Sequence, residues 1–360
     1  MTWTRFEQVR RIAVLRGGGL GDLVFTLPAI QALRDAYPQA DIALLGTAQH
    51  RELLRGRPGP VDRVELLPRA EGIHSGGVED TGTRDAFVEA LRARSLDLAC
   101  QLHGGGRFAN PFLLRLGARH TVGLRTPDAA ELERSLPYVY YQHEVARWLE
   151  VAALAGASSA LNEPHLEITA AERAAGRVRR DPGRPLLVIH PGATDPRRRW
   201  PVERFAGLAT ACAHDGWQVV VVGSGADAAL ADQVAALSGV QRVVSLAGTL
   251  TLGELLGVLA AATVVVGNDS GPRHLAQAVG AATVGLFWIG NVINGAPLSR
   301  ARHRVEMSWT TDCPICGVDV TQVGWTAPRC EHDVSFVADI PLDRIRDDVD
   351  ALAAVQASRP

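Results

Sequence analysis

The sequence predicts an α/β protein built from two Rossmann-like domains, each a doubly wound parallel sheet, which face a central cleft. Its 360 residues, 47% of them apolar, exceed one ordinary core, and two domains of about 150 to 180 residues are expected. Strand-like and helix-like stretches alternate in both halves, as in parallel sheets crossed by helices. A stretch rich in Pro, Gly and Arg interrupts the alternation and indicates a connection. The expected division is a first domain over residues 1–167, a linker over 168–185, a second domain over 186–340, and a C-terminal helix and tail over 341–360.

The expected elements follow from hydrophobic periodicity. In the first half, short aliphatic runs predict strands at residues 11–15, 41–45, 61–66, 96–102 and 121–123. Apolar residues spaced three and four apart predict helices at residues 28–36, 84–94, 111–116 and 143–155. The second half repeats the pattern, and several of its strands are continuous apolar runs, typical of a sheet covered on both faces. Its expected strands are 186–189, 218–222, 242–244, 263–266 and 283–287, and its expected helices are 202–213, 226–237, 252–261, 272–279 and 342–354.

The composition argues against several classes of function. With 37 basic and 39 acidic residues and no basic tail or stripe, the chain lacks the electrostatic signature of a nucleic-acid-binding protein. No apolar run reaches the ~20 residues of a membrane span, and the polar start does not resemble a signal peptide, so we expect a cytoplasmic protein. Five cysteines in a chain of this size do not form a disulfide framework.

The first candidate site is the glycine-rich turn at residues 16–22, after the first strand. Bare glycine backbone brings a chain close to a ligand. A dinucleotide site would need an acidic residue at the end of the second strand, where this chain has Leu45 and Gly46. Asp22 is the candidate general base, because a carboxylate after the glycines can accept the proton of an incoming hydroxyl. A helix cap is an equal alternative, since Pro28 indicates that a helix starts nearby.

Two loops of the second half are candidates for binding a diphosphate. Gly192, Ala193 and Thr194 follow a strand in a turn of small residues. Arg198 lies in a run of three arginines, and the planar guanidinium group pairs well with phosphate oxygens. A solvated basic loop is the alternative. Asp227 stands at a helix start, where it would accept hydrogen bonds from a ribose or cap the helix.

The most distinctive segment is a buried strand that runs directly into Asp269, Ser270, Gly271 and a helix with proline in its first turn. Free N–H groups at a helix start attract anions. We expect Asp269, Ser270 and His274 to face the cleft, where the helix dipole would add ~1 kcal/mol of charge stabilisation to a bound phosphate. Structural capping by Asp269 or Ser270 is the alternative, although capping does not explain the arginine-rich loop.

A late group of Cys313, Cys316, Cys330 and His332 indicates a metal site. Three thiolates and one imidazole are a suitable tetrahedral zinc set. Such a closed site leaves no open position for a substrate, so the zinc would be structural. Free thiols or a labile disulfide are an equal alternative.

Taken in order, these motifs resemble glycosyltransferase family 9, the bacterial ADP-heptose heptosyltransferases of GT-B fold. The resemblance spans nearly the whole chain. Where the family usually has a lysine two residues before Trp-Pro, this chain has Arg198, and Asp227 stands where the family often has glutamate. The segments that carry the resemblance are Gly21-Asp22 with Leu27-Pro28, His190-Pro191-Gly192-Ala193 with Arg198-Arg199-Trp200-Pro201, and Asp269-Ser270-Gly271-Pro272 with His274-Leu275-Ala276.

The resemblance implies an inverting, metal-independent transfer that needs no cofactor for catalysis. Asp22 would act as general base on the acceptor hydroxyl. The second domain would bind a nucleoside-diphosphate sugar, with ADP-heptose the favoured donor. The donor-binding residues so implied are Gly192, Ala193, Thr194, Arg198, Asp227, Asp269, Ser270, Gly271 and His274.

The acceptor would be bound by the first domain. Transfer to the lipopolysaccharide core is the common role of the family, and it would bring the protein to the inner face of the membrane. A polar or anionic acceptor, such as a lipid-linked glycan, suits the loop residues there, although a glycine-rich loop with solvated arginines is an equal alternative. The candidate acceptor-binding residues are Gly19, Gly21, His103, Arg107 and Arg125.

Two other functions remain open from the sequence. A sugar-nucleotide epimerase or hydrolase on the same scaffold would turn over the donor alone. A non-catalytic nucleotide-sugar-binding module would keep the Asp269 segment but tolerate loss of the Asp22 carboxylate.

Overall fold

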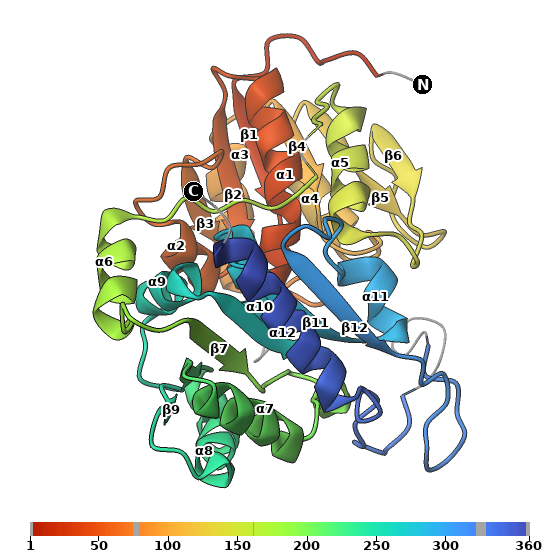
Figure 1. Ribbon diagram of the computed structural model, residues 1–360. Helices are drawn as coiled ribbons and strands as arrows, with labels where there is room; N and C mark the ends of the chain where they lie inside the picture. Colours follow the sequence, from red (N-terminus) through yellow and green to blue (C-terminus); the bar gives the residue numbers. More distant parts are fainter. Residues whose placement is uncertain (1–2, 75–78, 161, 322–328, 358–360) are drawn as a thin grey trace. The chain divides into compact units, whose positions relative to one another are not determined.

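The computed structural model describes residues 3–74, 79–160, 162–321 and 329–357. Its contacts divide the chain into two compact units, Met1–Glu167 and Ile168–Pro360 (Figure 1). Each unit is a six-stranded parallel sheet with helices on both faces, which confirms the predicted fold class. The central cleft expected between the units stays a prediction. Within the described ranges, no helix is both long and apolar enough to cross a membrane.

The sheet of unit 1 has the strand order β3-β2-β1-β4-β5-β6, and all its pairs are parallel. This is the order of the Rossmann fold, in which the direction of winding reverses between the first and fourth strands. Ligands of such folds bind beyond the carboxyl ends of these two strands. The strands are β1 Arg11–Leu15, β2 Asp41–Gly46, β3 Arg63–Leu66, β4 Leu98–Gln101, β5 His120–Arg125 and β6 Arg134–Pro137.

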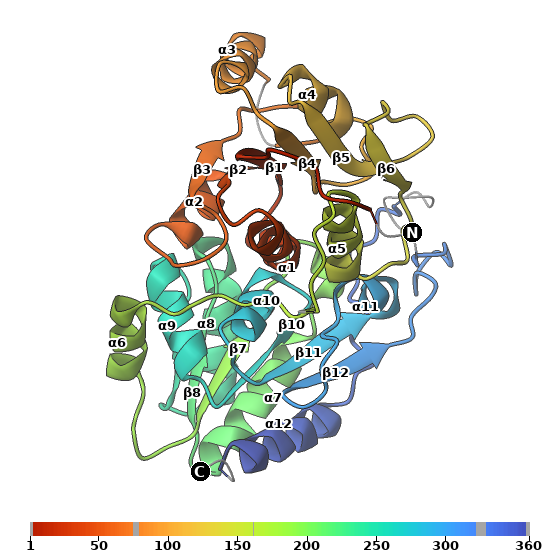
Figure 2. The same cartoon turned by 90° about the horizontal axis from the view of Figure 1, so that it is seen from above.

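Helices cover both faces of this sheet (Figure 2). Side chains alternate across a strand, so Ala13 and Leu15 of β1 lie on the face that packs on Leu91 of α3 and Phe112 of α4. On the other face, α1 and α5 pack against each other. The helices are α1 Leu20–Ala36, α2 Ala48–Leu54, α3 Thr81–Arg92, α4 Ala109–Arg115 and α5 Glu144–Leu154.

Unit 2 repeats the same topology. Its sheet has the order β12-β11-β10-β7-β8-β9, all parallel, so that its winding reverses between β7 and β10. The two Rossmann-like units therefore each have one position at which a ligand site is expected. The strands are β7 Leu186–His190, β8 Gln218–Val221, β9 Val243–Ser245, β10 Val264–Asn268, β11 Thr283–Trp288 and β12 His303–Ser308.

The helices of unit 2 also lie on both faces of its sheet (Figure 2). Leu187 and Ile189 of β7 share an apolar core with Phe205 of α7, Val234 of α8 and Leu352 of α12. Helices α9 and α10 pack on β7 and β10 from the opposite face. The elements are α6 Ala170–Arg179, η1 Pro196–Arg198, α7 Val202–His214, η2 Gly225–Asp227, α8 Ala228–Ser238, α9 Leu252–Ala261, α10 Gly271–Ala278, α11 Ile289–Gly295 and α12 Leu342–Ala357.

Two local expectations were wrong. Helix α1 does not start near Pro28 but at Leu20, and Pro28 lies inside it. The early start is stabilised by Asp22, whose carboxylate caps the backbone N–H of Gly19.

The segment 168–185, expected as the connection between the two domains, contains helix α6. This helix packs so closely on α9 that a Cβ atom on Gly176 would lie only 2.1 Å from the carbonyl oxygen of Gly257. The segment is therefore a packed part of unit 2.

Candidate functional site

In unit 1, the loops after β1 and β4 meet at the point where the winding reverses. Gly18 has a φ of +85°, and a Cβ atom on it would lie 2.5 Å from Oδ2 of Asp22. Only glycine fits this position without strain. Gly19 precedes α1 and donates its N–H to Oδ2 of Asp22 at 2.8 Å, and Gly21 is half-buried in the first turn. The glycine loop thereby fixes the direction of the Asp22 carboxylate.

Arg16 holds the second oxygen of that carboxylate. Its Nη2 donates to Oδ1 of Asp22 at 2.9 Å, and its Nη1 donates to the carbonyl oxygen of Leu102 at 2.8 Å. The guanidinium lies over the ring of Trp148, 5.0 Å from its centroid, and the arginine is only 4% exposed. Burial lowers the pKa of Arg16, although Asp22 opposes the shift. The Asp22 side chain itself stays 51% exposed, so it is fixed on one side and accessible on the other.

Two histidines contact the backbone of the glycine loop and hold it in position. Nδ1 of His103 accepts the N–H of Gly17 at 3.2 Å, which leaves its Nε2–H to donate to the carbonyl oxygen of Gly72 at 2.9 Å. Nε2 of His50 lies 3.1 Å from the carbonyl oxygen of Gly19. Burial lowers the pKa of each histidine to about 4, so both rings are neutral at pH 7. His103, expected to contact an acceptor, thus has both ring nitrogens bonded to backbone.

The two arginines expected to bind an acceptor lie in exposed ion pairs. Arg107 is 3.6 Å from Asp128, and its side chain is 68% exposed. Arg125 lies 3.1 Å from Glu131, also at the surface. Exposed pairs of this kind contribute little to stability, so both arginines remain accessible to an anionic ligand.

In unit 2, the loops after β7 and β10 are joined by Asn268, the last residue of β10. Its fully buried amide donates to the carbonyl oxygen of Pro191 at 2.8 Å and accepts the N–H of Trp200 at 3.0 Å. His190, the last residue of β7, is also buried, and its Nδ1 lies 3.0 Å from Oγ of Ser270. These contacts hold the two loops in one fixed arrangement at the carboxyl end of the sheet.

Asp269 is the centre of this arrangement. It is 6% exposed and accepts hydrogen bonds from His274 Nε2 at 3.0 Å, Asn291 Nδ2 at 2.8 Å and Arg198 Nη1 at 3.3 Å. Burial alone would raise the pKa of Asp269. The hydrogen bond from His274 and the charges of Arg198 and Arg273 outweigh that effect and hold the pKa well below its usual value. Asp269 is therefore a buried anion that positions the cations around it.

The structure distinguishes the three consecutive arginines. Arg197 is buried and paired with Asp195, whereas Arg199 donates to the carbonyl oxygen of Ala193 at 2.9 Å. Arg198 is 26% exposed, and within the described part of the chain only its Nη1 has hydrogen-bond partners. Its Nε and Nη2 groups can therefore donate to a ligand.

Helix α10 begins beside Arg198. Ser270 occupies the N-cap position but makes no capping bond, because its hydroxyl donates to the carbonyl oxygen of Asn268 at 3.1 Å. The backbone of Gly271 opens the first turn, and the N–H groups of such a turn form an anion site. His274 lies buried in the next turn, in contact with Arg273 as well as Asp269.

Asp227 and Gly192 lie against each other. A Cβ atom on Gly192 would be 2.2 Å from Oδ1 of Asp227, so the turn after β7 must be glycine there. Oδ2 of Asp227 accepts the N–H and the hydroxyl of Ser224, at 2.9 and 2.7 Å, and lies 3.8 Å from His190 Nε2. The interaction with His190 and these two bonds hold the pKa of Asp227 well below its usual value. Thr194 is exposed in the same turn.

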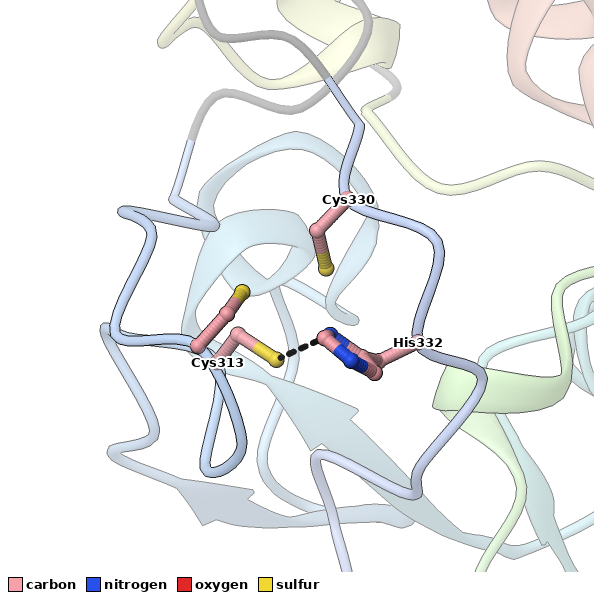
Figure 3. Close-up of side chains that lie close together, drawn as sticks. Cys313, Cys330 and His332 are labelled. Carbon is pink, nitrogen blue, oxygen red and sulfur yellow. Dashed lines mark hydrogen bonds between the residues drawn. The ribbon is translucent and has the colours of Figure 1, made fainter.

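The late cysteines also come together. Cys313, Cys316, Cys330 and His332 place one ligand atom each within 4.8 Å of one another, and Figure 3 shows the side chains of Cys313, Cys330 and His332 pointing toward a common point. The described cysteines are all free thiols.

The sequence did not indicate the residues that hold the candidate site residues in position. Arg16 and Asn268 carry a weak signal, since each is a polar residue at the end of a buried strand. The sequence indicates His190 only as one residue of the motif that ends β7. Asn291 lies in a helix that the sequence did not indicate.

Comparison with known proteins gives a consistent result. The model of the family described as "Glycosyltransferase family 9 (heptosyltransferase)" matches residues 84–314. The chain is similar to lipopolysaccharide heptosyltransferase 2 of Salmonella typhimurium, with 28% identity over 314 residues that cover 82% of this chain and 88% of that protein.

Two solved structures share the fold. ADP-heptose lps heptosyltransferase II of E. coli has a TM-score of 0.76 and 22% identity, covering 97% of this chain and 100% of the other. E. coli heptosyltransferase WaaC with ADP-2-deoxy-2-fluoro heptose has a TM-score of 0.63 and 21% identity, covering 83% and 93%.

Proposed function

Because the chain belongs to glycosyltransferase family 9, we propose that this glycosyltransferase moves heptose from ADP-heptose to a hydroxyl of a lipopolysaccharide core or a related glycan. One observation carries the proposal: a partly exposed guanidinium, that of Arg198, is held by the buried carboxylate of Asp269 beside the uncapped start of α10. A fixed cation next to free backbone N–H groups suits a diphosphate.

Unit 2 is the proposed donor site. Arg198 and the first turn of α10, at Ser270 and Gly271, would bind the diphosphate and stabilise the negative charge that develops on it as it leaves. Asp269 and His274 would keep Arg198 in place. ADP in the donor is supported by the E. coli WaaC structure, whose bound ligand is an ADP-sugar.

The nucleoside would lie on the neighbouring turn. Gly192, Ala193 and Thr194 would offer their backbone to it, and the missing side chain of Gly192 leaves room for the carboxylate of Asp227 beside this turn. Asp227 accepts hydrogen bonds at Oδ2 from Ser224, and Oδ1 would accept from a ribose hydroxyl.

Unit 1 would supply the base. The acceptor hydroxyl oxygen bonds to the anomeric carbon as its proton passes to the carboxylate of Asp22. The bond from that carbon to the β-phosphate oxygen breaks, and ADP leaves with the electron pair. Attack from the face opposite the diphosphate inverts the configuration at the anomeric carbon. Arg16 would keep the carboxylate oriented toward the acceptor.

In this proposal the protein itself neutralises the leaving group, so catalysis needs no metal ion. The acceptor would lie against Gly19, Gly21 and the half-buried His103. Its anionic groups would bind to the exposed side chains of Arg107 and Arg125. An acceptor of the lipopolysaccharide core would be met at the cytoplasmic face of the inner membrane.

Calorimetric titration with ADP, GDP and UDP tests the donor site. We expect ADP to bind, and Arg198→Ala to weaken it about tenfold or more, since hydrogen bonds to charged groups contribute about 1.5 to 3 kcal/mol each. Arg242→Ala is the matched control, because Arg242 is an exposed arginine of the same unit, and it should bind ADP like the wild type. Failure of all three nucleotides to bind, or unchanged binding by Arg198→Ala, would contradict the proposal.

Transfer itself is tested by ADP release from ADP-heptose with and without a lipopolysaccharide core acceptor. We expect release to depend on the acceptor. Release of ADP at an equal rate without acceptor would instead identify a hydrolase, and conversion of ADP-heptose to an isomer without net ADP release would identify an epimerase. Binding without turnover, unaffected by Asp22→Ala, would identify a non-catalytic module.

A further inference from the structure

The cysteine group lies outside the residues assigned to donor and acceptor. Cys313 and Cys316 belong to a tight turn that is closed by the N–H of Gly317 donating to the carbonyl oxygen of Cys313 at 2.9 Å. Cys330 and His332 come from a second segment, 14 residues beyond Cys316 in the sequence. The fold brings the four ligand atoms within 4.8 Å of one another (Figure 3).

The distances suit a single tetrahedral ion. With metal–sulfur and metal–nitrogen bonds of about 2.3 and 2.0 Å, tetrahedral geometry places a sulfur and a nitrogen ligand about 3.5 Å apart. Sγ of Cys313 lies 3.7 Å from Nδ1 of His332. Thiolate and imidazole ligands in a tetrahedral set are the preference of zinc. A disulfide would use two of the thiols and leave the third, with the histidine beside it, without a role.

The same region of the chain supports the loop that carries Arg198. The N–H of Phe336 donates to the carbonyl oxygen of Arg197 at 2.7 Å, and the hydroxyl of Ser335 donates to that of Arg199 at 2.6 Å. Cys313 and Phe336 are buried in one apolar core. The segment that follows His332 therefore packs directly beneath the arginine-rich loop.

We propose that Cys313, Cys316, Cys330 and His332 bind one structural zinc ion, which fixes the segment after His332 and thereby braces the loop of Arg198. The site uses four protein ligands, so it leaves no position for a substrate and takes no part in the transfer reaction. Because structural zinc contributes folding energy, its removal should lower stability as well as disorder this support.

Elemental analysis of the purified full-length chain tests the metal. We expect about one zinc per chain, lost in Cys316→Ser and retained in Cys212→Ala. Cys316 is exposed, so its loss should not disturb the core, whereas Cys212 is a buried cysteine distant in sequence and serves as the control. About one iron in place of zinc would overturn the zinc assignment. Absence of metal, with two of these cysteines resistant to alkylation until reduced, would overturn the site.

Thermal unfolding and ADP titration test the bracing role. Removal of zinc by a chelator should lower the unfolding midpoint by several degrees, and added zinc should restore it. ADP affinity should fall severalfold in Cys316→Ser and stay unchanged in Cys212→Ala. Zinc that binds without affecting either stability or ADP affinity would contradict the bracing role. The metal content and the unfolding midpoint decide this proposal even if the wild type binds no nucleotide.

Discussion

Replacing Asp269 by asparagine should strongly destabilise unit 2. The change preserves side-chain size but removes the negative charge that compensates Arg198 and the fully buried Arg273. Burial already lowers the pKa of Arg273 to about 10, and the charge of Asp269 is what opposes that shift. An asparagine amide would also place a donor against one of the three donors that now surround the carboxylate.

The size of the effect follows from the burial of the carboxylate. Asp269 is 6% exposed, and removing one partner of a buried ion pair typically costs about 3 to 5 kcal/mol. For a unit of this size, that loss corresponds to a fall of roughly 6 to 20 °C in the unfolding midpoint.

Urea and thermal unfolding, followed by tryptophan fluorescence, measure the effect. Trp200 and Trp217 are buried in unit 2 and report its unfolding, and Asp232→Asn on the exposed face of α8 is the matched control. We expect the control to differ from the wild type by less than about 0.5 kcal/mol. A loss below about 1 kcal/mol in Asp269→Asn would refute the view that Asp269 is a buried anion essential to the arrangement.

Three further predictions follow from single contacts. Arg16→Gln should lower the transfer rate at least about tenfold, since the hydrogen bond to Asp22 is lost together with the bond to the carbonyl oxygen of Leu102 that positions the guanidinium, while the Kd for ADP stays the same; equal losses in both would point to general misfolding. Gly192→Ala should weaken ADP binding and leave the helix content unchanged, because the new Cβ meets Oδ1 of Asp227 at 2.2 Å; unaltered calorimetric affinity would count against a donor at this turn. The free energy of unfolding should fall as the pH drops from about 6.5 toward 4. In this range His50 becomes protonated in the unfolded chain, whereas its buried ring in the folded protein, with a pKa of about 4, stays neutral. Urea titrations at several pH values measure this in the wild type and in His50→Gln. Over this pH range the free energy of unfolding should fall less in the variant, by at most about 3 kcal/mol, and an equal fall in both proteins would show that His50 is not the cause.

Both sheets were predictable from the sequence because their central strands are buried on both faces. Such strands are continuous apolar runs, and β1, β7 and β10 were found within one or two residues. The strands that were missed, β6 and β12, lie at the edges of their sheets. Both strands carry polar residues, so the apolar run that marks a strand is absent, whereas the other two edge strands, β3 and β9, keep short apolar runs and were predicted.

A candidate residue was predictable where a polar or charged side chain directly follows a buried strand. It was less predictable where contacts with residues distant in the sequence decide its role. Asp22 and Asp269 follow from position. The sequence could not separate Arg198 from its neighbours, because their roles depend on Asp195 and on the carbonyl oxygen of Ala193. Nor does it indicate that His103 turns both ring nitrogens toward backbone.

The transfer rate of Asp22→Asn, measured with ADP-heptose and a lipopolysaccharide core acceptor, tests the central claim most directly. Asparagine keeps the shape of the carboxylate but cannot accept a proton, so we expect the rate to fall by about 10² to 10⁴, with the Kd for ADP unchanged. A rate close to that of the wild type, with donor binding intact, would show that Asp22 is only a helix cap and that the base lies elsewhere.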